Sequence, residues 1–285
     1  MVRASRYLVR LIDKGRRAAL FDSPMLTVPS LAGGVAAAGL IVAVPAAAQN
    51  PTPPGATWPV HAMDRPRPPV VDPGSEPPPA PPPNDAVVLF GGATLEAWTH
   101  GEGGAPARWT VRDGAMEVNP GAGGLRTRRA FGDIQLHIEW SAPVPARGEG
   151  QERGNSGVFL MGLYEVQVLD SWRNDTYPDG QAGALYGQAP PLVNAVRPPG
   201  QWNAYDIVFR RPRFATGGEL LQPARVTVVL NGIVIHNNAA LHGRTAHGAA
   251  ARYAPHEDRL PLSLQDHGDR VRFRNIWVRE LPEQP

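Results

Sequence analysis

The 285-residue chain contains no cysteine. Disulfide bonds, which stabilise many exported domains, are therefore excluded, and so is a lipid anchor on an N-terminal cysteine. The folded part of the protein must be held together by its hydrophobic core alone. About 200 residues follow the N-terminal segments described below, which is an ordinary size for one domain.

Lysine is almost absent as well, because Lys14 is the only one in the chain. The formal net charge of +2 is unevenly distributed: the first 48 residues carry six basic and two acidic side chains, a net of +4, so the remainder carries −2. The isoelectric point near 9.2 therefore partly reflects the N-terminal segment. It is a weak reason to expect nucleic-acid binding, and we predict no nucleic-acid partner.

The sequence also lacks the 3.6-residue apolar period of a long helix and any repeat of propeller length. Apolar and polar residues instead alternate, as in half-buried strands, over residues 134–140, 205–209 and 226–230. Asn231-Gly232 predicts a tight hairpin turn, and a change of phase near Arg274 predicts a β-bulge. About ten to twelve short strands predict an all-β fold, a two-sheet antiparallel jelly-roll sandwich.

The N-terminus has the pattern of an export signal. Residues 31–48 form an apolar run that follows several arginines and ends in Ala46-Ala47-Ala48, so we predict a signal peptide over residues 1–48, with Met25 as an alternative start. The run is barely long enough to cross a membrane and is rich in glycine and alanine, which favours cleavage over a retained anchor. We expect a bacterial protein that is periplasmic or extracellular, without stable membrane insertion after cleavage.

Residues 49–83 hold 14 of the 32 prolines and end in PPPAPPP. Because proline fixes φ and has no backbone donor, this segment is predicted to be a disordered, extended, partly polyproline-II linker. A ligand for proline-binding domains is the alternative, but an export signal directly before the segment favours a spacer. The folded domain is then expected to comprise residues 84–285.

The stretch GNSGVFLMGLYEVQVLDS, residues 154–171, places a carboxylate and an amide inside an apolar strand. With Val166 and Val168 toward the core, Glu165 and Gln167 face outward. A lone outward glutamate usually has no function. Carbohydrate sites, however, combine aromatic rings that stack on the sugar with polar groups that bind its hydroxyls. Such groups recur in the chain at Asn155, Tyr186, Trp202, Gln265, Asp266 and His267.

These residues stand in blocks that resemble the DUF1080 family, also described as the 3-keto-disaccharide hydrolase domain. The blocks occur in the expected order from about residue 89 to residue 281, and they include LFGGATLEAWTH, GNSGVFL, YEVQVLDS, YPDGQAGALYG, PPGQWNAYDIVFRRPRF and LSLQDHGDRVRFRNIWVREL. The resemblance implies a concanavalin-like, laminin-G-like sandwich. One departure is the short GLYEVQ turn, where many members carry a few more residues.

The resemblance further implies an exported enzyme that cleaves the glycosidic bond of 3-keto-glycosides or 3-keto-disaccharides. A C3 ketone acidifies the hydrogen on C2, so removal of that proton allows elimination of the C1 substituent, after which water adds back. This route needs a base near C2, a stabiliser of the enolate oxygen and an acid for the leaving group. The sequence does not distinguish this route from direct hydrolysis.

Glu165 and His267 are the candidate catalytic residues. Partial burial would raise the pKa of Glu165, and histidine titrates in the working range, although His267 fits a structural role equally well. The candidate substrate-binding residues are Asn155, Gln167, Tyr186, Trp202, Gln265, Asp266 and Arg274. Of these, the two aromatic residues fit core packing equally well.

The loop DSWRNDTYPDG carries Asp170, Asp175 and Asp179, and calcium prefers oxygen ligands in such loops. Their spacing matches no EF-hand, and aspartate commonly shapes turns through bonds to the backbone, so we predict no cofactor. A divalent ion bound by Glu165, Asp266 or His267 is the alternative.

Two other functions compete with an enzyme. The first is a non-catalytic carbohydrate-binding module, and the second is a structural surface protein that uses its sandwich for protein contacts. The expected partner is an oligosaccharide or glycoside, and the sequence leaves the oligomeric state open.

Overall fold

The computed structural model describes residues 50–53, 55–101 and 103–283. The predicted signal peptide, residues 1–48, lies outside them. The described residues contain no α-helix, only the short 3₁₀ turns η1 (Gly150–Glu152) and η2 (Pro178–Gly180). In the same part of the chain, no helix is long and apolar enough to cross a membrane.

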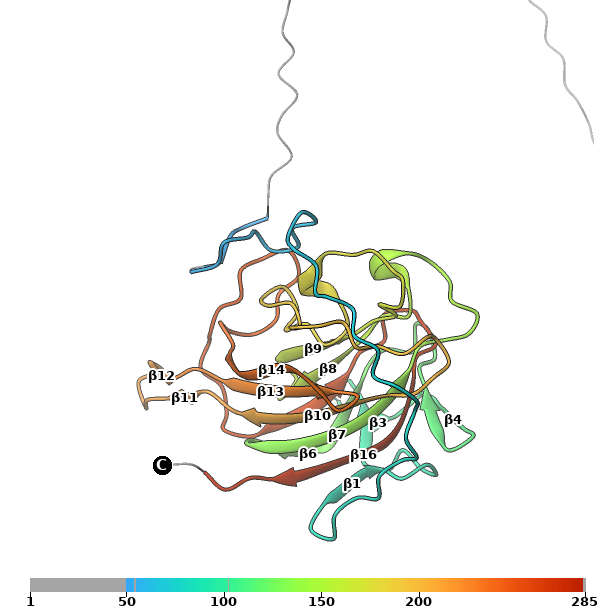
Figure 1. The fold of residues 1–285 in the computed structure, drawn as a ribbon. Helices are drawn as coiled ribbons and strands as arrows, with labels where there is room; N and C mark the ends of the chain where they lie inside the picture. Colours follow the sequence, from blue (N-terminus) through green and yellow to red (C-terminus); the bar gives the residue numbers. More distant parts are fainter. Residues whose placement is uncertain (1–49, 54, 102, 284–285) are drawn as a thin grey trace, which may run out of the picture. The chain divides into compact units, whose positions relative to one another are not determined.

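Two antiparallel sheets make up the domain (Figure 1). The larger sheet has the order β14-β13-β10-β7-β16-β5-β4, with β1 also paired to β16. Its strands are β1 (Val87–Phe90), β4 (Thr110–Arg112), β5 (Ala115–Glu117), β7 (Ile134–Ser141), β10 (Asn203–Arg210), β13 (Arg225–Leu230), β14 (Ile233–Ala240) and β16 (Arg272–Glu280).

The smaller sheet has the order β3-β2-β6-β15-β8-β9. Its strands are β2 (Trp98–His100), β3 (Ala105–Pro106), β6 (Leu125–Phe131), β8 (Ser156–Leu160), β9 (Tyr164–Val168) and β15 (Leu260–Leu264). A separate hairpin joins β11 (Arg213–Phe214) to β12 (Leu220–Gln222). The predicted all-β, two-sheet antiparallel sandwich is confirmed, with more and shorter strands than the alternation suggested.

The core is built from the strand faces that the alternation predicts. In β7, Ile134, Leu136, Ile138 and Trp140 are each at most 1% exposed. Aromatic rings from several strands fill the space between the two apolar faces, and the fully buried ones are Phe90, Trp98, Phe131, Trp140, Tyr164, Tyr205, Phe209 and Phe273. Burial of this apolar surface is the main stabilising contribution in a chain without disulfides.

Two local predictions are also confirmed. Asn231-Gly232 joins β13 to β14 with φ values of +54° and +84°, as a two-residue hairpin turn requires. The register of β16 against β7 shifts between Arg274 and Trp277, and Asn275 has a φ of +46°. This bulge allows the consecutive residues Arg274 and Asn275 both to contact Glu139.

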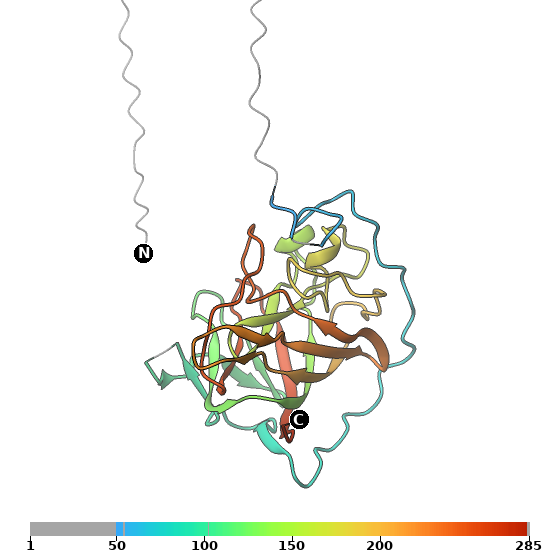
Figure 2. The ribbon, with the colours of Figure 1, turned by 90° about the vertical axis from the view of Figure 1, so that its left-hand side faces the viewer.

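The proline-rich segment is extended, as predicted, but it packs against the domain. Figure 2 shows the described residues of 50–83, here called the strap, running along the outside of the sandwich toward β1. Val60 is only 2% exposed, and Val70 forms a parallel bridge with Asn194. Further along, Arg197 donates to the carbonyls of Gly74 and Ser75. The expected disordered linker is therefore replaced, over these residues, by an anchored strap.

Candidate active site

A pocket of about 280 Å³ lies on the outer face of the smaller sheet, at the end formed by β8 and β9. Strand alternation turns Val166 and Val168 into the core and Glu165 and Gln167 toward the pocket. Loops that follow β9, β14 and β15 complete its walls. The lining residues are Asn155, Phe159, Glu165, Gln167, Tyr186, Thr245, His247, Gln265 and His267.

Glu165 is the carboxylate at the base of this pocket, and its side chain is almost fully removed from solvent, with 4% of the residue exposed. Burial raises its pKa to about 8, because the ionised form loses its hydration. Its backbone N–H donates to the Thr245 hydroxyl at 3.0 Å. The Gln167 amide nitrogen can be oriented to donate to a Glu165 carboxyl oxygen at 3.1 Å. Glu165 is therefore mostly a neutral acid at pH 7.

Gly157 makes room for this carboxyl group. It lies on β8, where it pairs with Gln167 of β9. A Cβ at this position would lie 2.4 Å from Glu165 Oε1 and 2.7 Å from a ring carbon of Phe159, so both side chains would have to move. The glycine in GNSGVFL is therefore a steric requirement of the site that the sequence pattern did not reveal.

A chain of hydrogen bonds runs behind one wall of the pocket. The hydroxyls of Tyr177 and Tyr186 lie 2.8 Å apart, and the Tyr186 hydroxyl lies 3.0 Å from Nδ1 of His247. Burial is the main cause that raises the pKa of Tyr186, and the nearby Glu165 and Asp179 carboxylates add to it. Tyr186 is therefore a neutral hydroxyl that is held in place from both sides.

Another part of the pocket lining presents buried acceptors. The Asn155 amide nitrogen donates to the Gln151 carbonyl at 2.7 Å. Asn155 Oδ1 and Gln265 Oε1 are both buried without a hydrogen-bond partner among the described residues. A buried acceptor without a partner costs about 1–3 kcal/mol, so donors on a ligand, such as sugar hydroxyls, would relieve this cost. His267 stands at the exposed rim beside them.

The structure brings six of the nine candidate residues to this pocket and places three elsewhere. Asp266 is the first of the three: its carboxylate accepts from the backbone N–H groups of Gly123 at 2.8 Å and Gly268 at 3.0 Å. It thereby shapes the loop that presents Gln265 and His267, and it does not line the pocket.

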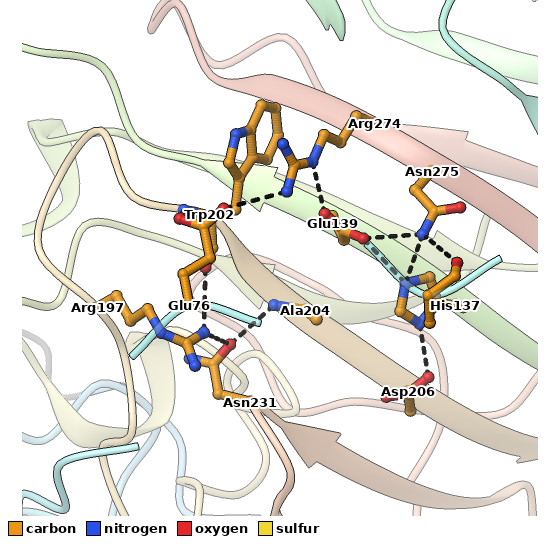
Figure 3. A network of polar contacts seen from close by, with 11 residues as sticks. Glu76, His137, Glu139, Arg197, Trp202, Ala204, Asp206, Asn231, Arg274 and Asn275 are labelled. Atoms are coloured by element: carbon orange, nitrogen blue, oxygen red, sulfur yellow. Dashed lines mark hydrogen bonds and ion pairs between the residues drawn. The ribbon is translucent and has the colours of Figure 1, made fainter. Parts of the chain in front are cut away.

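Trp202 and Arg274 lie on the outer face of the larger sheet, beside a second pocket of about 200 Å³ (Figure 3). The Arg274 guanidinium stacks over the Trp202 ring at 4.1 Å and binds Glu139 at 2.6 Å. From the strap, Glu76 accepts from the backbone N–H of Trp202 at 3.0 Å and from the Arg274 guanidinium at 3.1 Å. These two candidates therefore belong to a polar network on the other sheet.

The same network holds the buried side chains of His137 and Glu139 and the half-exposed side chain of Asp206. His137 lies 2.7 Å from Asp206 and 3.5 Å from Glu139. Burial would lower the pKa of His137, but hydrogen bonds to these two carboxylates outweigh it and raise the pKa to about 9. Burial opposes the ionisation of Glu139, yet bonds from His137, Asn275 and Arg274 lower its pKa to about 2. Each charge has a partner, as a structural role requires.

The acidic loop after β9 uses its carboxylates within the protein. Asp170 binds Arg153 at 2.7 Å, Asp175 pairs with Arg67, and Asp179 accepts from the His61 N–H at 3.0 Å. Across the residues that the structure describes, no group of three or more His, Asp or Glu side chains is placed to hold a metal ion. The aspartates thus shape the loop and anchor the strap.

Residues that the sequence analysis did not select complete the site, namely Gly157, Phe159, Tyr177, Thr245 and His247. Phe159 lies on β8 opposite Glu165, so correct pairing of the two strands would have found it. Thr245 and His247 lie in an irregular loop between β14 and β15. No periodic signal marks them.

Comparison with known proteins identifies the family and the fold of the chain. The profile of the 3-keto-alpha-glucoside-1,2-lyase-like domain matches residues 85–279. A 3-keto-disaccharide hydrolase of Bacteroides thetaiotaomicron is 25% identical over 259 residues, which cover 68% of this chain and 78% of that protein. The crystal structure of a proposed glycosyl hydrolase from Parabacteroides distasonis is 44% identical with a TM-score of 0.69, and the match covers 81% of this chain and all of that one. Another from the same organism, at 19% identity and a TM-score of 0.52, shares the fold.

Proposed function

The chain belongs to the family of 3-keto-alpha-glucoside-1,2-lyase-like domains, and from this premise we propose that it cleaves the glycosidic bond of 3-keto-glycosides or 3-keto-disaccharides by elimination and hydration. The pocket around Glu165 carries the proposal. It gathers a buried acid, a histidine, a tyrosine hydroxyl and several amide groups in a space of about 280 Å³. That size lies near the lower end of small-molecule pockets, roughly 300 Å³ and above, and suits one sugar ring.

The reaction has four bond changes. A base takes the proton from C2, and the electron pair forms an enolate with the C3 carbonyl. The enolate then expels the C1 oxygen, which accepts a proton as the C1–O bond breaks. Water adds to C1 of the resulting enone, and a proton returns to C2. Substrate and products together differ only by one added water molecule, so the net reaction is hydrolysis of the glycosidic bond.

We assign Glu165 the role of a hydrogen-bond donor to the C3 oxygen of the substrate. Negative charge develops on this oxygen as the C2 proton leaves, and a neutral carboxylic acid can donate a hydrogen bond to it. Burial keeps this carboxyl group protonated near neutral pH, because its pKa is raised to about 8. An ionised glutamate at the same position would repel the enolate.

The remaining roles fall to His267 and Tyr186. His267 is exposed at the rim, where an imidazole can pass the C2 proton to solvent. Tyr186 has a protonated hydroxyl in contact with His247, so it is suited to protonate the departing C1 oxygen. Asn155, Gln167 and Gln265 are assigned to the sugar hydroxyls.

Incubation of the purified protein with a 3-keto-glucoside in deuterated water tests this mechanism. Elimination and hydration place deuterium at C2 of the product sugar, whereas direct hydrolysis leaves the C2–H bond intact. The free 3-keto sugar in the same buffer without enzyme measures spontaneous exchange. Product that carries no more C2 deuterium than this control would refute the elimination route.

We also propose that the enzyme acts outside the cytoplasm, because of the export pattern in residues 1–48. Expression of the full chain in a bacterial host, followed by fractionation and N-terminal sequencing, tests this. A mature protein that begins near Gln49 is expected. An unprocessed chain in the cytoplasm would contradict it.

A further inference from the structure

His61, on the strap, packs against the rings that form one wall of the candidate active site. Its ring stacks on Tyr177 with centroids 4.1 Å apart and an interplanar angle of 23°. It also meets Tyr186 edge-on at 5.1 Å, and His247 at 5.3 Å. A single strap residue thus contacts all three members of the hydrogen-bonded chain Tyr177–Tyr186–His247.

The backbone around His61 is fixed. Its N–H donates to Oδ2 of Asp179 at 3.0 Å, and Asp179 is fully buried. His61 has a φ of +60°, a left-handed conformation that is uncommon outside glycine, although Asn, Asp and His adopt it more often than other residues. The preceding Val60 is buried and donates its N–H to the Pro51 carbonyl. Such a conformation persists only where the surroundings determine it.

The imidazole itself is suited to stacking without adding charge. Burial lowers the pKa of His61; the Asp179 carboxylate opposes this effect and His247 adds to it. This shift favours the neutral form of the ring. The ring supports Tyr177 and Tyr186 as a flat surface.

Contacts further along hold the strap in place. Arg197 donates to the carbonyls of Gly74 and Ser75, and Asn275 donates to the carbonyl of Ala80. Between these points, Glu76 binds Arg274 and the Trp202 N–H in the network of Figure 3. The strap is therefore attached to the larger sheet at one part and to the pocket wall at another.

We propose that the strap is a working part of the active site and that His61 is a positioning residue, which holds Tyr177 and Tyr186 so that the Tyr186 hydroxyl faces the bound sugar. This inference rests on the proposed function of the pocket. His61 does not line the pocket, so its effect on the reaction passes through the tyrosines.

Two substitutions at one position separate the ring from the backbone. His61→Asn removes the ring but tolerates the left-handed conformation, and His61→Phe keeps a flat ring without the imidazole nitrogens, at the cost of some backbone strain at a φ of +60°. Met63→Ala, at an exposed strap residue two positions away, is the matched control. With a 3-keto-glucoside, we expect H61N to lower kcat about 10- to 100-fold with KM within about twofold, because misplacement of a reacting group acts on the chemical step. H61F should restore most of kcat, and M63A should match the unaltered protein.

Hydrogen exchange of the amides in residues 177–187 gives a readout that does not depend on activity. Faster exchange there in H61N, but not in H61F or M63A, is expected. If the unaltered protein turns over no 3-keto-glycoside, the proposed function fails and the exchange data alone decide the role of His61. Should H61N not fold, His61→Gly, which lacks a ring and adopts the left-handed conformation without strain, replaces it. A kcat or an exchange pattern in the ringless variant equal to that of M63A would overturn the inference.

Discussion

The Glu165 carboxyl group occupies the space that a side chain at Gly157 would fill, because a Cβ there would lie 2.4 Å from Glu165 Oε1. Gly157 has no left-handed φ, so its absence of a side chain serves the neighbouring strand and not its own backbone. The position of the Glu165 carboxyl group thus depends on the absence of a side chain at position 157 of the neighbouring strand. This dependence gives the most direct structural test of the pocket.

Gly157→Ala is expected to displace the Glu165 side chain and to lower kcat/KM by about 100-fold, as a shift of about 1 Å in a reacting group can do. Steady-state kinetics with a 3-keto-disaccharide measures the loss. Gly217→Ala is the control, since a Cβ at Gly217 meets nothing within 4 Å and its φ is not left-handed. Equal kinetics in the two variants would show that Glu165 need not occupy its present position.

Glu165→Gln and His267→Ala should each lower turnover by about 100- to 10,000-fold, because an amide is a much weaker hydrogen-bond donor to the enolate oxygen than a carboxylic acid, and alanine removes the proposed base for the C2 proton. Affinity for the same 3-keto-disaccharide, measured calorimetrically, should largely survive. A carbohydrate-binding module without catalysis predicts that the unaltered protein has no turnover to lose. Full turnover in both variants would remove the assignment of these two residues.

The pH dependence of the rate should follow the buried acid. Burial raises the pKa of Glu165 from 4.5 to about 8, so the donating form predominates below about pH 8. We expect kcat of the unaltered protein to fall at high pH with a midpoint near pH 8. The residual kcat of E165Q should show no such fall. A profile that is flat from pH 7 to pH 9 in the unaltered protein would contradict a neutral Glu165.

The same shift predicts a change in stability. The folded state keeps a proton on Glu165 between pH 4.5 and about pH 8, where the unfolded chain releases it. This contribution is complete below pH 4.5 and is lost as pH rises to about 8. Relative to E165Q, the unaltered protein should therefore lose on the order of a few kcal/mol of unfolding free energy across this window. Urea unfolding at pH 5 and pH 8 measures the difference, and an unchanged difference between the two proteins would count against the burial argument.

His137→Gln should destabilise the domain without a matching loss of turnover, because His137 belongs to the network on the larger sheet and not to the Glu165 pocket. Removal of one member of a buried ion cluster costs roughly 3–5 kcal/mol. The pKa of His137 is raised from 6.5 to about 9, so its contribution is complete below pH 6.5 and is lost as pH rises through about 9. Urea unfolding of both proteins at pH 6 and pH 10 should show this difference shrinking. A loss of kcat larger than the loss of folded protein would instead connect this network to catalysis.

Much of the fold follows from local patterns. Alternation in Ile134–Trp140 predicts both the strand and its buried face, and Asn231-Gly232 predicts its turn, because each depends on neighbours in the chain. The same period-two rule places Glu165 and Gln167 on one face of β9. The alternation undercounts strands because several have only two or three residues, too few to show a period.

The rest of the site depends on contacts that no local pattern records. Trp202 and Arg274 have the composition of a sugar site, but the sequence does not tell to which sheet a strand belongs, and these residues lie on the other sheet. His247 comes from an irregular loop, so only the folded chain brings it to Tyr186. Proline content predicted that the strap is extended. It could not predict the docking of His61, which requires a surface built by residues more than a hundred positions later.

The strap has a practical consequence for work on related chains. The shared domain, as the family profile defines it, begins at residue 85, so trimming the gene to that border would delete His61 and Glu76 together. A protein shortened in this way would keep every strand of both sheets and lose the ring that stacks on Tyr177 together with the carboxylate that binds Arg274. Its folding and its turnover could therefore be measured separately.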